Sequence, residues 1–422
     1  MEKEISIRPS DGALATAVFQ AAIDKVSAAG GGVIVVHPGS YTIGMVTLKS
    51  NVHLRLMPGS VISASTDRAH YSDIVFYKQT KNPYTGHALF FAQDVSNVAI
   101  YGDGEIHGND RSFWNPRKPE DLSDAAPHFT PKGWRPNAIA FENCQKIRIQ
   151  GISIKSSSVY ALWLIDCKQV VVREVNVEHD FHGPNTDGFH ISSCQNVTIS
   201  GCFFHCGDDC IAVDGDGRNV ARNVTISDCV FESLTNAVRV YVGLDPWVAE
   251  HVFGEVTQVT IANSTIRNAA GGINIVAKMG RISMVSVSNI SCIQKLPGTC
   301  VFLHTMDGEI EDVSISGLIA EGNGVCAMMA DRPGSISRVS LRDSSFSLRF
   351  QEKPWSLGFP EILTDYTCYH HAPWTLHFRR VHGLTLDQIA VRLVDQPNEC
   401  PPLLRLEATQ DVYEHRLTSS MG

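Results

Sequence analysis

Three stretches of eleven residues decide the fold: CQKIRIQGISI at 144–154, CKQVVVREVNV at 167–177 and CQNVTISGCFF at 194–204. Each stretch begins with a cysteine, continues into an apolar-x-apolar triplet, and crosses a short corner into a second alternation. Alternation with a period of two is the pattern of a β-strand with one buried face. Each stretch therefore predicts two short strands joined by a corner.

The same frame recurs along most of the chain. Upstream, the triplets at Val52 and Val98 fit the frame if each is separated from the following triplet by two repeat units. Downstream, the triplet at Leu384 fits after a long insertion. The other triplets follow one another by 23, 27, 27, 35, 26, 28 and 26 residues and begin at Ile147, Val170, Val197, Val224, Val259, Val285, Val313 and Val339. A unit of this size cannot bury an apolar face alone, so the units must stack.

Stacked units predict an all-β fold, a single-stranded right-handed parallel β-helix of about ten or more coils. A β-propeller is the alternative, but its blades need about 40–50 residues each. Cysteines at equal offsets in their units support interior ladders: Cys144, Cys167 and Cys194, then Cys202 and Cys229. We expect packed thiols rather than a metal site, because the C-x3-C-x3-C that begins at Cys202 is not a usual zinc spacing.

Residues 11–32 depart from the repeat. They show helical periodicity before a glycine stop, with apolar positions at Leu14, Val18, Ala21, Ala22 and Val26. An uncovered end coil would expose a sheet edge and the core. We therefore expect residues 1–45 to form an N-terminal cap of one helix and the first strand, continuous with a β-helix over 46–422 in a single domain.

The composition excludes several classes of function. The 422 residues carry a net charge of -9, whereas nucleic-acid binding without sequence preference needs a basic surface. No stretch approaches 18 consecutive apolar residues, so we expect no membrane span. The start, MEKEISIRPSDG, lacks the apolar segment of a signal peptide. We expect a cytoplasmic protein, or a secreted one if a signal segment has been removed; the sequence does not give the oligomeric state.

Three aspartates stand out in the segment GPNTDGFHISSCQNVTISGCFFHCGDDCIAVD at 183–214. Asp187 precedes Asp208 by 21 residues, about one short coil, and Asp209 follows at once. The three should therefore lie on neighbouring coils at one place on the circumference. Gly207 permits the bend that lets both members of the pair face outward. Converging carboxylates cost electrostatic energy that a fold does not need, which indicates a catalytic role. Three solvated corner residues are the alternative, and the spacing alone does not decide between the two.

The motif NTDG at 185–188, followed by CGDDC at 206–210, resembles the active-site signature of glycoside hydrolase family 28, the polygalacturonase family. The resemblance implies hydrolysis of pectic glycosidic bonds with inversion of the anomeric centre, and it implies no cofactor and no metal. The likeness covers most of the chain, through stretches at 21–62, 100–110, 133–164 and 377–407.

By this resemblance, Asp208 is the general acid, and Asp187 and Asp209 hold and deprotonate the attacking water. Asn185 orients one of the carboxylates by hydrogen bonding. The chemistry agrees, because inversion requires an acid and a base-held water on opposite sides of the bond, with the carboxyl groups about 6.5–9.5 Å apart. Repulsion among clustered carboxylates would also raise one pKa and keep an acid protonated near neutrality.

Two motifs of the family are altered in this sequence. Where the next coil usually carries GHG, the chain reads LTNAVRV, with Asn236 at the place of the histidine. The following coil usually carries RIK, whose cations bind a galacturonate carboxylate, but here it reads GGINIVAKMG. Asn274 and Val276 stand at those places, and Lys278 falls on the same face as Val276 if the strand continues. In a second alignment NAVRV is itself the RIK segment, and Arg239 binds the carboxylate.

Further ligand candidates surround the carboxylates. His182 and His205 flank them in the sequence, and Tyr241 is expected to point outward on the neighbouring coil. Two aromatic-rich insertions, at 108–136 and at 352–374, would suit the faces of sugar rings. Packing on the helix wall or contact between subunits is the alternative for both.

The sequence thus predicts an exo-acting hydrolase of galacturonan-type or rhamnogalacturonan-type oligosaccharides. The altered carboxylate-binding motifs leave open a glycosidase of the same fold that acts on neutral-sugar oligosaccharides. A β-helix polysaccharide lyase or epimerase is another alternative, and a lyase would need Ca²⁺ and a basic proton abstractor. A non-catalytic carbohydrate-binding β-helix is the last alternative, and the clustered aspartates speak against it.

Overall fold

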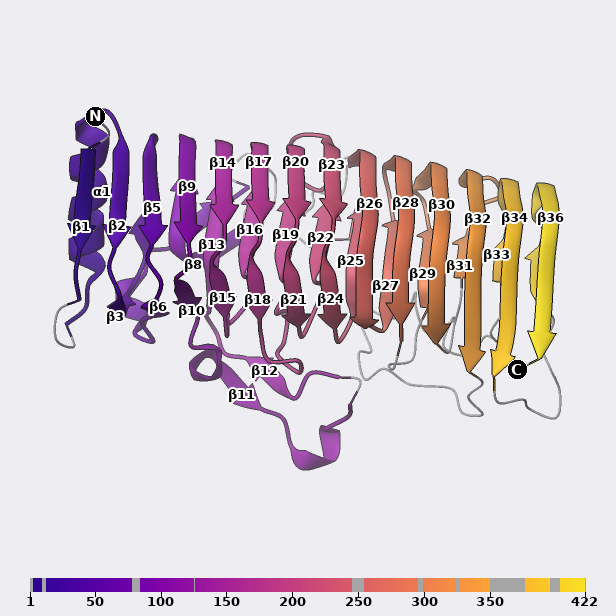
Figure 1. Cartoon of the computed structure of the whole chain (residues 1–422), viewed down its shortest axis with the longest axis horizontal. Coiled ribbons are helices and arrows are strands. Elements are labelled where there is room, and N and C mark those ends of the chain that lie inside the picture. The colour runs from indigo at the N-terminus through magenta and orange to yellow at the C-terminus, as the bar shows by residue number, and fades with distance from the viewer. Residues whose placement is uncertain are drawn as a thin grey trace.

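The chain forms a right-handed parallel β-helix whose coils follow one another along the long axis (Figure 1). The N-terminal and C-terminal coils lie at opposite ends. The predicted fold class is therefore confirmed. The computed structural model describes residues 3–9, 13–77, 84–124, 126–244, 254–294, 299–322, 326–349, 376–394 and 403–421.

One sheet of 21 strands receives two strands from each early coil, one on either side of a corner. From β26 onward a single long strand takes the place of the two. The strands are β1 (Lys3–Ile7), β2 (Gly32–Val36), β3 (Gly39–Ile43), β5 (Val52–Leu56), β6 (Ser60–Ala64), β9 (Ser96–Gly102), β10 (Glu105–His107), β14 (Gln145–Gln150), β15 (Ser153–Lys155), β17 (Lys168–Arg173), β18 (Asn176–Glu178), β20 (Gln195–Ser200), β21 (Phe203–Cys206), β23 (Ala221–Ser227), β24 (Val230–Ser233), β26 (Glu255–Asn268), β28 (Arg281–Ile293), β30 (Glu309–Gly322), β32 (Ile336–Arg349), β34 (Val381–Val394) and β36 (Gln410–Met421).

A second sheet of 13 strands carries the site described below. Its strands pair in parallel, except that β7 pairs antiparallel with β8. They are β4 (Val46–Thr47), β7 (Ile74–Phe76), β8 (Tyr84–Gln93), β13 (Pro136–Glu142), β16 (Leu162–Ile165), β19 (Phe189–Ser192), β22 (Ile211–Asp214), β25 (Asn236–Val242), β27 (Gly271–Ala277), β29 (Thr299–Thr305), β31 (Cys326–Ala330), β33 (Leu376–Arg379) and β35 (Leu404–Glu407). The remaining elements are α1 (Thr16–Ala28), the ribbon of β11 (Trp114–Pro116) and β12 (Phe129–Pro131), and the 3-10 helices η1 (Arg68–His70), η2 (Asp110–Phe113) and η3 (Pro119–Asp121).

The predicted triplets lie in register. Ile147 pairs with Val170, Val170 pairs with Val197, and the ladder runs on to Leu384 on β34. The two-step spacing expected upstream is wrong, because Val98 pairs directly with Ile147 and β5 pairs directly with β9. The extra length in these coils is an inserted segment in each, the β7–β8 hairpin and residues 108–136, and not an additional coil.

Asparagines at one corner help to set this register. The residue before each triplet adopts a left-handed backbone, with φ of 58° at Asn97 and 57° at Asn196 and at Asn223. Asparagine tolerates this conformation better than most residues with a side chain. The side chains also bond along the helix, since Asn223 Nδ2 donates to Asn196 Oδ1 at 2.8 Å and Asn97 Nδ2 donates to Asn51 Oδ1 at 2.9 Å. Successive coils therefore turn at the same point.

Apolar ladders fill the interior of the helix. The rings of Phe189 and Phe204 have centroids 4.8 Å apart, and those of Phe204 and Phe231 lie 5.4 Å apart. Each coil buries its face only against its neighbours, so these contacts supply most of the stability. The predicted cysteine ladders are confirmed as interior positions, since all of the following are buried: Cys144, Cys167, Cys194, Cys202 and Cys229.

The helix α1 packs beside β1 and β2 at the N-terminal end (Figure 1). It buries Phe19, Ala22, Ile23 and Val26, and the chain leaves it through Gly30, whose φ is 93°. The predicted cap helix is confirmed, but its buried face is centred on Phe19 and Ile23. Three residues expected on that face are exposed: Leu14, Val18 and Ala21. No helix among the described residues is long and apolar enough to cross a membrane.

Residues 108–136 project from the helix wall on the side where β11 and β12 lie (Figure 1). The indole N–H of Trp114 donates to the Ser158 carbonyl at 2.9 Å, and the Trp134 ring packs against the rings of Tyr71 and His87, which lie outside the insertion. Both tryptophans of this insertion therefore hold it to the helix. The other aromatic insertion, at 352–374, lies outside the described residues.

Candidate active site

The three aspartates lie at one edge of the 13-stranded sheet. Asp187 comes just before β19, and Asp208 and Asp209 come just before β22, the next strand. The Gly188 N–H donates to the Asp209 carbonyl at 2.9 Å and holds the two segments in line. The structure thus brings the carboxyl groups together on neighbouring coils, as their spacing predicts.

The corner before Asp208 and Asp209 has no space for a side chain at Gly207. A Cβ at this position would lie 2.5 Å from the Gly183 carbonyl oxygen and 2.7 Å from that of Asp180. Its backbone is not in the left-handed region. The glycine therefore lets two coils approach each other, and an unusual backbone angle is not what selects it.

Asp208 is partly buried among the other carboxyl groups. Its Oδ1 accepts a hydrogen bond from Thr235 Oγ1 at 3.0 Å, and Asn185 Nδ2 lies 3.5 Å from its Oδ2. Burial raises the pKa of Asp208 well above its usual range, and the charges of Asp187 and Asp209 raise it further. Asp208 is therefore the carboxyl group with the strongest reason to hold a proton.

Asp209 is held by donors from the following coil. Asn236 Nδ2 donates to its Oδ1 at 2.7 Å, and Thr235 Oγ1 lies 2.9 Å from the same oxygen, so its single O–H is shared between Asp208 and Asp209. Arg239 Nη1 lies 3.5 Å from its Oδ2, with the guanidinium 4.8 Å from the centre of the Tyr241 ring. These contacts suit an ionised carboxylate, because every partner donates or carries positive charge.

Asn274 lies one coil further on and reaches the site through Asn236. Its Nδ2 donates to Asn236 Oδ1 at 2.9 Å, so the two amides form a chain that ends on Asp209. In the sheet register β22 pairs with β25, which places Arg239 on the coil directly after the aspartates. Arg239 therefore lies beside the carboxyl groups.

Asp187 contacts a histidine that the sequence analysis missed. His190 Nδ1 lies 3.2 Å from Asp187 Oδ2, and His190 Nε2 lies 3.1 Å from Asp214 Oδ2. Burial raises the pKa of Asp187 above its usual value, and the hydrogen bond and charge of His190 limit that rise without cancelling it. Burial opposes protonation of His190, but its hydrogen bonds to both carboxylates outweigh burial and raise its pKa well above the usual range.

Arg135 is a second residue that sequence reasoning missed. Its Nη2 donates to Asn185 Oδ1 at 2.7 Å, and its Nη1 donates to the Pro184 carbonyl at 2.6 Å. Arg135 stands at the end of the projecting insertion, 50 positions from Asn185 in the chain. It therefore fixes the amide that faces Asp208 and links the insertion to the site.

For three predicted ligand residues the structure gives contacts other than the aspartates. His182 stacks on His128 of the insertion, with ring centroids 3.7 Å apart, and its Nδ1 bonds the Ala126 carbonyl. His205 belongs to the larger sheet, where its Nδ1 bonds the His179 carbonyl. Lys278 follows the last residue of β27, is exposed, and makes no ion pair among the described residues. The prediction placed Lys278 on the same face of the sheet as Val276 on the condition that the strand continues through Lys278. That condition is wrong, because β27 ends at Ala277.

Aromatic side chains cover the outward face of the sheet on the coils before the site. Trp163 pairs with His190 in the sheet register, and the Phe76 ring from β7 lies 4.6 Å from the Trp163 ring. Tyr160 stacks on His190 itself at 4.5 Å. The sheet is therefore covered by β7 up to the coil that carries the carboxyl groups.

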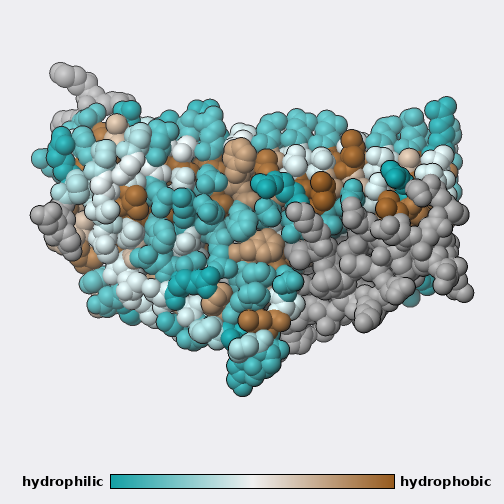
Figure 2. Space-filling view, turned by 60° about the horizontal axis from the view of Figure 1, so that its bottom comes forward, coloured by the Kyte–Doolittle hydropathy of each residue, from teal (hydrophilic) through white to brown (hydrophobic). Residues whose placement is uncertain are grey.

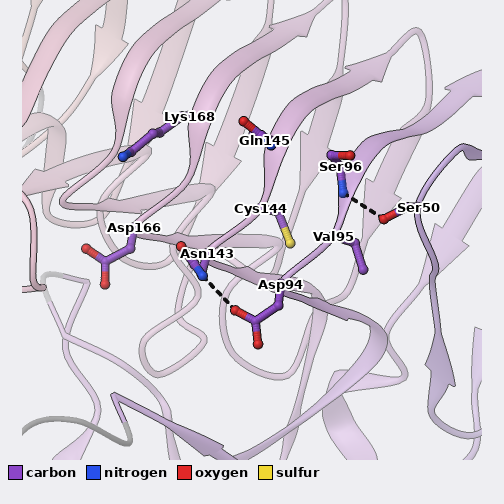
Figure 3. Close-up of a pocket in the computed structure, with 9 residues that line it drawn as sticks. All are labelled: Ser50, Asp94, Val95, Ser96, Asn143, Cys144, Gln145, Asp166 and Lys168. Carbon is purple, nitrogen blue, oxygen red and sulfur yellow. Dashed lines mark hydrogen bonds between the residues drawn. The ribbon is translucent and has the colours of Figure 1, made fainter.

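A hollow of about 310 Å³ lies at the opposite edge of the same sheet (Figure 3). It is formed where β8, β13 and β16 end, whereas the aspartates precede β19 and β22. Asn143 Nδ2 donates to Asp94 at 2.6 Å, and Asp166 accepts bonds from Arg218 and Asn219. Asp94, Asn143 and Asp166 of the hollow are thus hydrogen-bonded within the protein, and the hollow lies at the other edge of the sheet from the aspartates.

Neither the coloured part of Figure 2 nor the described metal-ligating side chains point to a second site. On the part of the face that Figure 2 colours by hydropathy, hydrophobic side chains are scattered among hydrophilic ones. No group of three or more His, Cys, Asp or Glu side chains among the described residues is placed to hold a metal ion. The aspartate cluster is therefore the described group with chemistry to explain.

Comparison with known proteins assigns the class. The model of the family described as glycosyl hydrolases family 28 matches residues 33–295. A polygalacturonase of Persea americana is 28% identical over 212 residues, which are 50% of this chain and 42% of that protein. The chain spans about half the length, or less, of the curated relatives it matches.

Solved structures agree in fold. The family 28 exopolygalacturonase of Yersinia enterocolitica has a TM-score of 0.69 at 14% identity, over 97% of this chain and 78% of that chain. A hyperthermoactive exopolygalacturonase of Thermotoga maritima has a TM-score of 0.61 at 20% identity, over 82% and 87%. Together, fold and sequence define a parallel β-helix protein of the carbohydrate-active class. The chain belongs to glycoside hydrolase family 28, which confirms the family predicted from its motifs.

Proposed function

We propose that the protein hydrolyses glycosidic bonds of pectic oligosaccharides with inversion. The observation that carries this proposal is the unequal surroundings of the carboxyl groups: those of Asp208 favour its proton most strongly, and Asp209 is held by donors. Asp208 has a pKa raised by burial and by the charges of Asp187 and Asp209, whereas Asp209 accepts hydrogen bonds and faces Arg239. An acid and a base in one cluster are what hydrolysis requires.

In the proposed reaction Asp208 protonates the leaving oxygen as the bond to the anomeric carbon breaks. Asp187 and Asp209 orient a water on the opposite side of the sugar and accept its proton as the new bond forms. The proton given by Asp208 is replaced from solvent after the products leave. Asn185, held by Arg135, orients Asp208.

Arg239 supports an acidic sugar as the substrate. Its guanidinium is partly exposed, adjoins Asp209 and is stacked on Tyr241. A planar guanidinium suits a carboxylate, because it can donate two parallel hydrogen bonds. Several relatives of the chain are named polygalacturonases, which agrees with galacturonate as the sugar.

Action from a chain end is supported by the covered face of the sheet. The β7 strand and the rings of Phe76 and Trp163 occupy the coils before the carboxyl groups. A long polysaccharide lying along the helix axis would meet this cover. We therefore propose exo action on short chains.

A neutral sugar in one subsite is the second candidate. Asn236, Asn274 and Val276 stand where the family motifs carry a histidine and two cations. Amide groups bond sugar hydroxyls well but supply no charge for a carboxylate. This substitution favours a substrate in which acidic and neutral sugars alternate.

The deciding experiment is a substrate panel. Oligogalacturonates, rhamnogalacturonan oligosaccharides and neutral oligosaccharides are each incubated with the protein, and released reducing ends are measured. We expect reducing ends to be released from at least one pectic oligosaccharide. Exo action predicts that only the smallest products form during the first minutes. Proton NMR before mutarotation should show an anomeric configuration opposite to that of the bond cleaved. Retained configuration would contradict inversion, and no release from any pectic member would contradict the proposed function.

A further inference from the structure

His190 lies directly behind Asp187 and has no part in the proton transfers proposed above. It is 3% exposed on β19, and its ring lies between two carboxylates. Nδ1 is 3.2 Å from Asp187 Oδ2, and Nε2 is 3.1 Å from Asp214 Oδ2. A neutral imidazole carries one N–H, whereas the imidazolium carries two. Two carboxylate acceptors on opposite sides therefore fit the charged ring.

The second carboxylate is fixed by its own donors. Ser192 Oγ donates to Asp214 Oδ2 at 2.6 Å, and the Asp216 N–H donates to Asp214 Oδ1 at 2.8 Å. Asp214 is fully buried, so these bonds leave it little freedom to turn. Asp214 thus anchors the far side of the His190 ring.

Groups from the adjoining coils also contact the ring. Tyr160 stacks on one face at 4.5 Å, and the Tyr241 hydroxyl of β25 lies 3.0 Å from Nε2. Arg239, also on β25, pairs with Asp209 at 3.5 Å. The His190 ring is a positively charged group within hydrogen-bond distance of Asp187. The carboxyl groups in this region include Asp187, Asp208, Asp209, Asp214 and the buried Asp216, whose backbone N–H bonds Asp214.

We propose that His190 is a positioning residue, an imidazolium that bridges Asp187 and Asp214 and keeps the Asp187 carboxylate ionised and correctly turned. This inference rests on the proposed function, in which Asp187 receives a proton from the attacking water. His190 gains and loses no proton during the reaction. Its charge offsets the burial of Asp187, and its two hydrogen bonds set the direction in which the free oxygen of that carboxylate points.

The kinetic test compares His190→Gln and Asp214→Asn with a matched control, His87→Gln. His87 is also buried and bonds an aspartate, with Nε2 3.0 Å from Asp73 Oδ1, but it lies on β8. We expect kcat to fall about 10–100-fold in His190→Gln, because a misplaced catalytic group costs about that much, while KM changes by less than about twofold. Asp214→Asn should show a smaller loss, and the control none.

The pH profile separates positioning from a structural role. The acid limb of kcat/KM reports the base of the free enzyme. An opposite charge nearby lowers a carboxyl pKa by about 1–3 units, so the limb should move to higher pH by about one unit or more in His190→Gln. A role in packing alone would lower the melting temperature and leave the limb where it is. An unmoved limb in an active, folded variant would overturn the proposal.

A second measurement needs no activity. Protein labelled with ¹⁵N-histidine is examined by NMR, and the ring of His190 is assigned from the signal that His190→Gln lacks. An ordinary histidine is neutral above about pH 7, but we expect both nitrogens of His190 to be protonated at pH 7.5. A neutral His190 ring at that pH would overturn the proposal. If the wild type hydrolyses no pectic oligosaccharide, the proposed function fails, and this spectrum still decides the charge of His190.

Discussion

Asp208 is partly exposed, and its burial and the neighbouring carboxyl groups raise its pKa, so it can hold a proton and give it to a substrate. Asp208→Asn keeps the size of the side chain and removes the acid. We expect kcat on the best pectic substrate to fall about 10²–10⁴-fold, the usual contribution of general acid catalysis. Asp228→Asn, at an exposed corner of the following coil, is the control and should keep its activity. A rate close to wild type in Asp208→Asn would remove Asp208 from the mechanism.

The same substitution should stabilise the protein near neutral pH. Burial and the charges of Asp187 and Asp209 raise the folded-state pKa of Asp208. Between the unfolded and folded pKa values, the folded state holds a proton that the unfolded state has lost, so stability falls as pH rises through that window. Asparagine removes this penalty. The melting temperatures of wild type and Asp208→Asn should agree near pH 4 and differ by about 2 °C for each kcal/mol at pH 7. A difference that does not change with pH would contradict the argument.

Arg239 and Lys278 provide a matched pair of cations. Hydrogen bonds between charged groups contribute about 1.5–3 kcal/mol, so Arg239→Gln should raise KM for oligogalacturonate about 10–100-fold. Lys278→Gln should change KM by less than about twofold, because Lys278 is exposed beyond the end of β27. Steady-state kinetics on trigalacturonate measure both. An effect confined to Lys278→Gln would mean that the substrate carboxylate lies one coil further along than proposed.

At the scale of an element, the corner before β22 depends on Gly207. A methyl group there would press on the carbonyls of Gly183 and Asp180, both closer than 3 Å to the added Cβ. We expect Gly207→Ala to move the Asp208–Asp209 corner and lower kcat at least tenfold, with a lower melting temperature. Gly133→Ala is the control, because nothing lies within 4 Å of its added Cβ. Equal activity of the two variants would show that the corner adapts.

The strands were predictable from the sequence because every coil must bury apolar side chains in the same interior and therefore repeats the apolar-x-apolar triplet. The triplets from Ile147 to Leu384 keep that pattern and lie in register. The coil count upstream was not predictable, since an inserted segment and an extra coil add similar numbers of residues between Val52 and Val98. Local periodicity also misplaced the face of α1, because exposed Val18 and buried Phe19 are adjacent and both apolar.

The site was predictable only where its partners repeat with the coil. The spacing of the aspartates equals one coil, so their meeting follows from the fold. Arg135 reaches Asn185 from an irregular insertion, and no period of the sequence connects the two. His190 carried a usable signal that was missed: it shares the outward row of the sheet with Arg239, two strands away. A histidine at an outward position of the sheet, close in sequence to an aspartate motif, indicates a residue of the site.

At the scale of the whole molecule, each coil contacts only its neighbours. A destabilising substitution at one end should therefore weaken only the coils near that end. Phe19→Ala in the cap helix should cost about 3–5 kcal/mol, the usual price of removing a buried phenylalanine. Hydrogen exchange should show lost protection in β1, β2 and β5, with β19 and β22 unaffected and hydrolysis unchanged at 25 °C. Val18→Ala, at a half-exposed position of the same helix, should be nearly neutral. Uniform loss of protection would show that the helix unfolds as one unit.

The buried thiols have a consequence for following the opening of single coils. All ten described cysteines are free and buried, and they are spread over coils from Cys144 to Cys326. A thiol reagent modifies such a cysteine only while its surroundings are open. Timed alkylation followed by peptide mass spectrometry would therefore rank the local opening rates of the natural protein with no introduced label. Cys206 and Cys210 border the aspartate pair, so the same experiment would show whether bound oligosaccharide slows the opening of that corner.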